Sequence, residues 1–385
     1  MSYTQLSLSP TPQPTLSPED FEALFNHYYS IETSWQILMK IGGAVSCISS
    51  FVLVTHILKK KWADISLTSS LLLGISVMDI LGSFFTYFMG LWMGGEGVFF
   101  ITSGPLLAGN TQTCTAQGFI LTFTLTYFVT AYTGLGALYC LMARRGWTKN
   151  QMKTNKMRAA FLLPPVIASL AMAVPPLFYQ MYNPAGLYCS LNAYPNNCES
   201  DQDVQCTRGV DAGIVQAVSL LYALLCNLIV IVFMVLLICS VYNQEKKSDK
   251  YLSKGQEKKR DYTIETAWQG IRYSGALTIP FVPLYVSLGY SLTDTTPGET
   301  TALVWIYLTV ILTPFLGFNN ACVYFYPRYK AYRKSHKDLS RFRCIFDTLG
   351  IAWKSTWTLG VNSDTNLSEP LVDGSDNGGG SGHVV

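Results

Sequence analysis

Long apolar segments alternate with short polar ones over most of the chain. A helix needs about 20 residues to cross the ~30 Å hydrocarbon core of a bilayer, and each apolar segment is at least that long. The seven segments occupy residues 35–58, 66–93, 114–142, 159–180, 211–241, 264–290 and 300–326. The pattern therefore predicts an all-α membrane protein, a bundle of seven transmembrane helices within residues 35–326.

The two ends of the chain differ from this bundle. Residues 1–34 are rich in Pro, Ser and Thr and lack the basic start and apolar core of a cleavable signal peptide. We expect an unstructured tail there, and a second over residues 351–385, where Ser, Asp, Asn and Gly dominate. Residues 327–350 alternate basic with aromatic and aliphatic side chains, which predicts a short amphipathic helix on the membrane surface.

Composition predicts that the chain lies in a membrane, and the distribution of its charges predicts its orientation there. Of 385 residues, 49% are hydrophobic and 13% are charged, which is typical of a membrane protein and unlike a nucleic-acid-binding domain. Of the 27 Lys and Arg, 24 lie in loops one, three and five or after segment seven. Basic loops stay in the cytosol, so we place the N-terminus outside and the C-terminus inside.

Four cysteines fall on the outer side in this orientation, namely Cys114, Cys189, Cys198 and Cys206. An even number of cysteines in an oxidising compartment predicts two disulfides. The other six lie within spans or on the inner side, where thiols stay reduced. One of them, Cys344, lies beside basic residues in the predicted amphipathic helix and is a candidate for palmitoylation, with an unmodified thiol as the alternative.

Two short patterns point to a family. Cys114 followed by Gln-Gly-Phe at 117–119 opens the third segment, and the seventh carries a GFxNxxxY pattern with Asn320 and Tyr324. With the order of the segments, these patterns resemble the G-protein-coupled receptors, closest to the cyclic-AMP-receptor-like group that borders on the secretin-like receptors. Asp79, at the end of Leu-Gly-Ile-Ser-Val-Met-Asp, also matches part of the helix-two pattern of the rhodopsin-like receptors.

The resemblance implies a structure for the outer face and a function for the inner one. It implies that Cys114 pairs with Cys189, which leaves Cys198 and Cys206 to close a small loop. It also implies a plasma-membrane receptor that converts binding of an extracellular ligand, unidentified by the sequence, into nucleotide exchange on a heterotrimeric G protein. The residues expected to face that G protein are Arg144, Arg145, Lys258, Lys259 and Arg260. Topology and attraction to anionic membrane lipids explain the same charges without a partner.

Asp79 is a carboxylate at bilayer depth, which costs several kcal/mol unless other groups solvate it. Two interpretations stay open: a structural plug between helices, or a hydrated switch that biases the bundle between two packings. In the bundle that the resemblance implies, Asp79 lies within reach of Asn320, directly or through water, with Tyr324 one turn closer to the cytosol. A bound Na⁺ or a change of protonation would operate such a switch. The sequence predicts no other metal site and no cofactor.

Several further residues carry two interpretations each. Pro280 and Pro283 bend helix six, as a hinge or for packing alone. Arg272 is best explained as a side chain that reaches the inner interface. The candidates for an outer ligand pocket are Lys40, Gln117, Gln216, Tyr285 and Trp305, although Tyr and Trp also form interfacial belts.

Other functional classes fit less well. The histidines are His27, His56, His336 and His383, and none lies deep in a span, so a zinc hydrolase is not expected. A retinal protein needs a lysine in helix seven, and residues 302–327 contain none. We therefore expect no enzyme activity. The runner-up is a multi-pass transporter of a small solute, although the chain lacks an internal repeat and several midplane charges.

Overall fold

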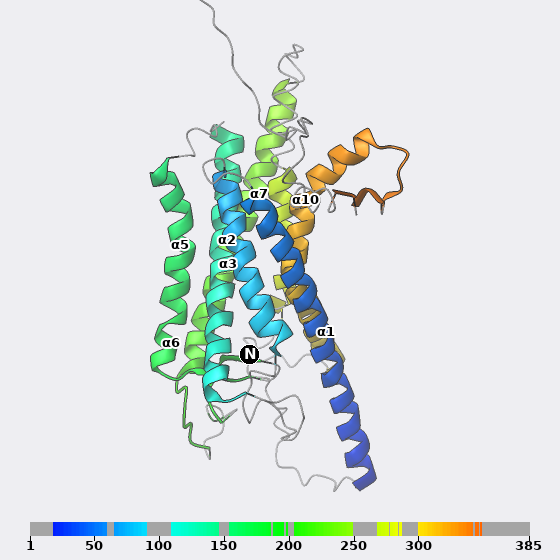
Figure 1. Cartoon of the computed structure of the whole chain (residues 1–385). Helices are drawn as coiled ribbons and strands as arrows, with labels where there is room; N and C mark the ends of the chain where they lie inside the picture. The colour runs from blue at the N-terminus through cyan, green and yellow to red at the C-terminus, as the bar shows by residue number, and fades with distance from the viewer. Residues whose placement is uncertain are drawn as a thin grey trace, which may run out of the picture.

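The computed structural model describes residues 18–59, 65–90, 109–145, 154–185, 188–195, 198, 204–248, 268–276, 278–283, 285–286, 299–341, 343–345 and 347–348. Most of them are helical. The α-helices are α1 Pro18–Leu58, α2 Leu67–Gly82, α3 Thr111–Arg145, α5 Asn155–Ala173, α6 Pro175–Phe178, α7 Ala212–Ser248, α9 Glu299–Leu312 and α10 Leu316–Ser335. The long helices run side by side as a bundle (Figure 1).

Six helices in the described part are long and apolar enough to cross a membrane, as in a multi-pass membrane protein. They span Gln36–Leu58, Leu67–Phe88, Thr111–Arg144, Asn155–Phe178, Ala212–Ser240 and Tyr307–Ser335. The predicted sixth span, 264–290, is described only at residues 268–276, 278–283 and 285–286, all helical and here called segment six. Seven spans and their orientation therefore stay a prediction.

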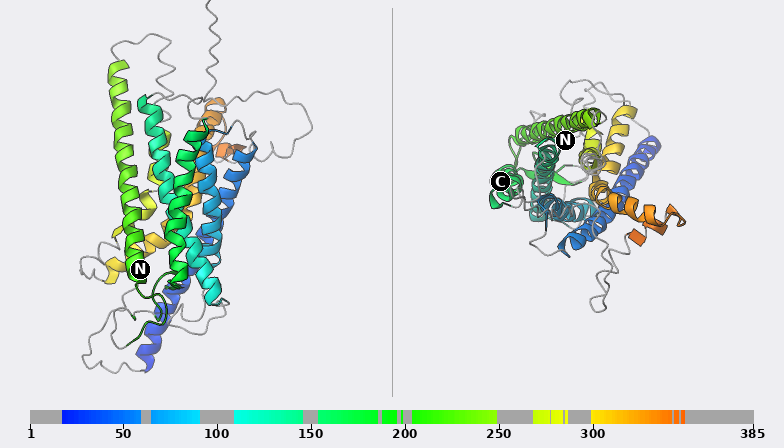
Figure 2. Two further views of the ribbon diagram at one scale, coloured as in Figure 1. Left: turned by 90° about the vertical axis from the view of Figure 1, so that its left-hand side faces the viewer. Right: turned by 90° about the horizontal axis from the view of Figure 1, so that it is seen from above.

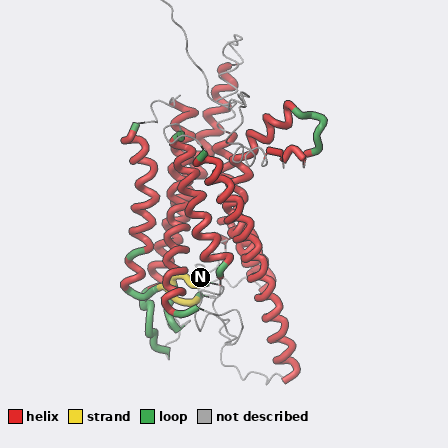
Figure 3. Tube along the Cα trace, in the orientation of Figure 1, coloured by secondary structure: helices red, strands yellow, loops and turns green. Residues whose placement is uncertain are grey.

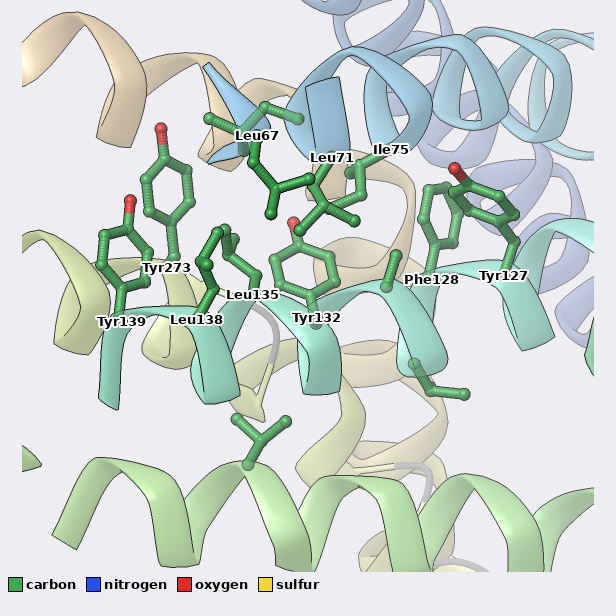
Figure 4. Packing of buried hydrophobic residues seen from close by; sticks show 14 of the residues in the cluster. Leu67, Leu71, Ile75, Tyr127, Phe128, Tyr132, Leu135, Leu138, Tyr139 and Tyr273 are labelled. Atoms are coloured by element: carbon green, nitrogen blue, oxygen red, sulfur yellow. The ribbon is translucent and has the colours of Figure 1, made fainter. Parts of the chain in front are cut away.

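Helix α3 lies at the centre of the core. It packs against α2, α5 and α7, and most of its apolar side chains are buried. Leu71 and Ile75 of α2 point toward Tyr132 and Leu135 of α3, and these four side chains form the middle of the core (Figure 4). The buried surface of α3 thus fixes the positions of its neighbours.

A short hairpin covers one end of the bundle (Figure 3). Strand β1, Tyr182–Pro184, pairs antiparallel with β2, Cys189–Leu191. Disulfides join Cys114 to Cys189 and Cys198 to Cys206, the two pairs that the resemblance implied. The Tyr182 hydroxyl donates a hydrogen bond to the carbonyl of Ala173 at 2.8 Å, and burial raises the pKa of this phenol. We call this end the hairpin end.

The opposite end carries the basic residues and is called the basic end. Helix α3 ends there at Arg145, and the C-terminal half of α10 leaves the bundle sideways in two perpendicular views (Figures 1 and 2).

Three predicted spans are interrupted in the structure. Helix α2 continues as a π-helix over Ser83–Phe88. The fourth span divides into α5 and α6 at Val174, before two prolines, and the seventh contains a 3₁₀ turn, Thr313–Phe315, between α9 and α10. Prolines lack the N–H that continues a helical ladder, which explains the last two interruptions.

The predicted tails also need correction. Helix α1 begins at Pro18, so residues 18–34 are helical rather than unstructured. A proline at the first helical position followed by two acidic residues favours such a start. The amphipathic helix predicted over 327–350 does not begin as a separate element, because α10 continues through Pro327 to Ser335 and helical residues resume at 341. Residues 1–17 and 349–385 lie outside the described part.

Candidate functional site

Asp79 of α2 is solvated by two serines of α1. Its Oδ2 atom accepts hydrogen bonds from Ser50 Oγ at 2.7 Å and Ser46 Oγ at 3.1 Å. The serines are four residues apart, so their side chains lie on the same face of the helix. The Asp79 side chain is buried, yet these bonds replace part of the hydration that it loses.

Helix α10 completes this cluster with its backbone. The N–H of Gly317 donates a hydrogen bond to Ser46 Oγ at 2.7 Å. Any Cβ at position 317 would collide with the Asp79 carboxylate and the Ser50 hydroxyl, so only glycine allows α10 to come this close. A chain of hydrogen bonds therefore links α10 to α1 and α1 to α2.

A cavity of about 10 Å³ adjoins the carboxylate, and its lining includes Asp79, Ser83, Thr86 and Thr124. The Thr86 hydroxyl is buried and has no hydrogen-bond partner among the described residues. This volume is roughly that of one water-sized sphere. A carboxylate beside hydroxyl oxygens also suits a hard cation, so the residues fit the Na⁺ considered from the sequence. Within the described part, no three His, Cys, Asp or Glu side chains gather as a metal site.

Asn320 of α10 forms a hydrogen bond with α3. Its Oδ1 accepts a hydrogen bond from the Tyr132 hydroxyl of α3. Among the described contacts no hydrogen bond joins Asp79 directly to Asn320, because Gly317, one turn earlier on α10, occupies the place beside Asp79. The described hydrogen bonds thus form two neighbouring clusters, Asp79–Ser46–Ser50 and Tyr132–Asn320, that share α10. A link from Asp79 to Asn320 through water stays a prediction.

Tyr324 lies one turn beyond Asn320, toward the basic end. Its ring packs edge-on against His56 of α1, with the ring centroids 5.8 Å apart. The Arg328 guanidinium carbon lies 5.1 Å from the centre of the same ring, and Arg328 also hydrogen-bonds to His56. The ring contact of Tyr324 and the hydrogen bond of Arg328 therefore join α10 to His56 of α1 near the basic end.

Gln117, a candidate for the ligand pocket, joins three parts of the hairpin end. Its Nε2 donates to the carbonyls of Phe85 at 3.0 Å and Gly90 at 2.7 Å, and its Oε1 accepts from the backbone N–H of Cys189 at 2.8 Å. The side chain is fully buried. The amide thus bonds to the π-helix, the chain after it and β2, and a role of Gln117 in a ligand pocket stays a prediction.

The other pocket candidates are spread over several elements. The Tyr285 hydroxyl accepts a hydrogen bond from Asn227 Nδ2 at 2.9 Å, which links segment six to α7. Lys40, Gln216 and Trp305 are half-buried on α1, α7 and α9. Their role in a ligand pocket stays a prediction.

The sites predicted near the basic end are described in part. Arg144 is exposed at the end of α3, whereas Lys258, Lys259, Arg260 and the Arg145 side chain lie outside the described residues. Pro280 and Pro283 are buried in segment six. Cys344 is also buried, so acylation would require the chain around it to open, and palmitoylation stays a prediction.

Sequence reasoning missed the residues that solvate Asp79. Ser46 and Ser50 stand in GGAVSCISS, where small and hydroxyl residues recur with helical spacing. This pattern marks close helix contact in membranes and could have identified α1 as the partner of α2. Tyr132 gave no comparable signal, because it is one of 23 tyrosines in the chain.

No protein-family model and no curated protein matches this chain. Its functional interpretation therefore depends on the residues and contacts described above.

Proposed function

We propose that this protein is a G-protein-coupled receptor of the plasma membrane, in which an extracellular ligand shifts the helix bundle and so promotes nucleotide exchange on a heterotrimeric G protein. The observation that carries the proposal is the pair of buried polar clusters that α10 shares with α1, α2 and α3. Both clusters adjoin the apolar core around α3.

These clusters favour discrete packings over gradual movement. A buried carboxylate needs hydrogen bonds in every state that it occupies, and so does a buried amide. Gly317 and Asn320 both belong to α10, so a shift of this helix has to replace hydrogen bonds in both clusters together. The cavity beside Asp79 offers a water or Na⁺ as the replacement partner. A small displacement at a ligand site would then become a two-state change.

The inner part of α10 would transmit this change. Tyr324 contacts α1 through its ring contact with His56, and Arg328 contacts α1 through a hydrogen bond to the same His56. Both contacts converge on one side chain of α1, so fewer interactions have to break here than in the two buried clusters. Displacement of Tyr324 and Arg328 would alter the basic end, where Arg144 is exposed and a G protein would bind.

The decisive variant is Asp79→Asn. The amide oxygen of Asn can still accept the hydrogen bonds from Ser46 and Ser50, so the fold is retained while the negative charge is lost. We expect a several-fold change in basal nucleotide exchange across a panel of co-expressed Gα subunits, measured in membranes with equal surface expression. Exchange by the parent should also differ between low and high Na⁺, and exchange by the variant should not.

Asp211→Asn is the matched control. It makes the same chemical change at an exposed position before α7, with a φ of 67° that Asn also tolerates. Failure of the parent to raise exchange above mock membranes with any Gα would contradict the receptor proposal, and solute uptake by vesicles of the same membranes would favour the transporter. Identical exchange by Asp79→Asn and the parent at both Na⁺ concentrations would leave Asp79 as a structural plug.

A further inference from the structure

The C-terminal half of α10 carries an open groove of about 400 Å³. The side chains that line it, here called the α10 groove, are Tyr326, Tyr329, Lys330, Arg333, Lys334 and Lys337. Their spacing of three and four residues places the helical ones on one face of α10. The groove therefore follows from the sequence pattern as well as from the shape of the surface.

The groove is strongly cationic. Lys330, Arg333, Lys334 and Lys337 are all exposed, and no carboxylate belongs to its lining. None of these four cations forms an ion pair within the described part of the chain. Like charges at helical spacing repel one another, and an anion bound between them would remove that repulsion. The residues thus favour a ligand that carries several negative charges.

Aromatic side chains form the inner wall of the groove. Arg333 Nη1 donates a hydrogen bond to the Tyr329 hydroxyl at 3.3 Å, which holds this cation toward the ring. The Arg272 guanidinium carbon of segment six lies 4.2 Å from the centre of the Tyr326 ring. A fifth cation therefore stands behind the groove, at the contact between segment six and α10.

The position of the groove favours a membrane lipid as the source of the anion. This half of α10 leaves the bundle sideways at the basic end (Figures 1 and 2), and Tyr326 and Tyr329 belong to the helix Tyr307–Ser335 that is apolar enough to enter a membrane. Tyrosine rings and lysine stems prefer the boundary between hydrocarbon and water. A lipid headgroup would meet the groove at this depth without leaving its leaflet.

We propose that the α10 groove binds the headgroup of a phospholipid that carries phosphate monoesters, such as a multiply phosphorylated inositol phospholipid. Each monoester brings a charge of about −1.5 to −2 and three acceptor oxygens, which match several Lys and Arg donors at once. A headgroup with one net negative charge would neutralise only one of the four cations. The site is independent of nucleotide exchange, so its test does not depend on the receptor proposal.

The test uses the purified full-length chain in nanodiscs. Native mass spectrometry counts the lipids that remain bound when the bilayer contains the phosphorylated inositol lipid, or phosphatidylserine at the same total charge. We expect one inositol lipid bound in preference to phosphatidylserine. Lys330→Gln combined with Lys334→Gln should weaken this binding by about 25-fold, because each cation near an anionic surface contributes roughly fivefold in affinity.

Lys156→Gln combined with Lys246→Gln is the matched control. These lysines are exposed on α5 and α7 and do not line the groove, and their loss removes the same charge. The control should bind within about twofold of the parent, since salt screens exposed charges that do not touch the ligand. An unchanged melting temperature in both double variants shows that the fold is retained.

Four results would overturn the proposal. The first is an equal loss of lipid binding in the control, and the second is equal binding of phosphatidylserine, because both indicate diffuse attraction without a site. The third is full competition by a soluble inositol polyphosphate at the affinity of the lipid, which would make a free metabolite the ligand. Unchanged lipid binding in the groove variant, with weaker binding of an acidic protein, would assign the groove to a protein partner instead.

Discussion

The hairpin end and the basic end of this bundle are held by different kinds of interaction. At the hairpin end, the Cys114–Cys189 disulfide and the three hydrogen bonds of Gln117 join α3 to β2, the π-helix and Gly90, and a second disulfide closes the short loop from Cys198 to Cys206. At the basic end, α10 is joined to α1 by the ring contact of Tyr324 and the hydrogen bond of Arg328 with His56, and to segment six by the cation–π contact of Arg272 with Tyr326. A covalent bond holds the hairpin end, whereas the described contacts at the basic end are non-covalent.

The two kinds of interaction contribute different amounts to the free energy of unfolding. A disulfide contributes typically 2–4 kcal/mol to the free energy of unfolding, whereas a cation–π contact contributes about 0.5–1 kcal/mol at an exposed site. A membrane helix can therefore move at the basic end at little cost while the hairpin end keeps its geometry. The proposed receptor function requires this division, and substitutions at the two ends should differ in their effect on stability.

The largest effect is expected when the long disulfide is removed. Cys114→Ala with Cys189→Ala opens a loop with a sequence separation of 75 residues. The chain-entropy model gives a loss of about 4 kcal/mol in the free energy of unfolding. Cys198→Ala with Cys206→Ala, with a separation of 8 residues, should cost about 2–3 kcal/mol in the same model. Thermal unfolding in detergent measures both, and equal losses would contradict this ranking.

Gln117→Leu should destabilise the hairpin end by about 3 kcal/mol, because it leaves two carbonyls and one N–H buried without partners. Hydrogen exchange of the Cys189 amide should rise in the same variant. Gln216→Leu is the control, since Gln216 is only half-buried on α7, and we expect a change below about 1 kcal/mol there. Equal effects of the two substitutions would mean that the Gln117 hydrogen bonds are not what stabilises this end.

At the basic end, Tyr324→Leu should cost only about 1 kcal/mol. It removes the ring contacts with His56 and Phe325 and the cation–π contact with Arg328 but keeps an apolar side chain. Basal nucleotide exchange should change several-fold in the same membranes. Tyr242→Leu, at an exposed position on α7, should alter neither quantity. A loss of stability as large as that of Gln117→Leu would remove the distinction between the two ends.

The smallest effect is expected for Arg272→Gln, which removes the cation beside Tyr326 and should cost about 0.5–1 kcal/mol. Because Arg272 stands behind the α10 groove, its loss should also weaken binding of the phosphorylated lipid a few-fold. Arg341→Gln is the control at an exposed position after α10. A similar loss of lipid binding in this control would mean that net charge matters and the local contact does not.

The sequence predicted the helices better than their ends. The length of the apolar segments identified the described spans, since every span has to cross a hydrocarbon core of the same thickness. It did not predict the π-helix at Ser83–Phe88 or the helical start at Pro18. The π-helix coincides with the bond from Gln117 to the Phe85 carbonyl, a contact between residues 32 positions apart. Such a contact leaves no local pattern in the sequence.

The sequence by itself determined a helical chain with membrane-length apolar segments and a buried carboxylate, because hydrophobicity and charge act on each segment separately. It also limited the disulfides to four cysteines. Only the tertiary structure decided the hydrogen-bond partners of three buried side chains. Asp79 bonds to Ser46 and Ser50, Asn320 bonds to Tyr132, and Gln117 bonds to the backbone of the hairpin end. Hydrogen bonds are short and directional, so their partners depend on the rotation and depth of each helix, which the packing of the whole bundle sets.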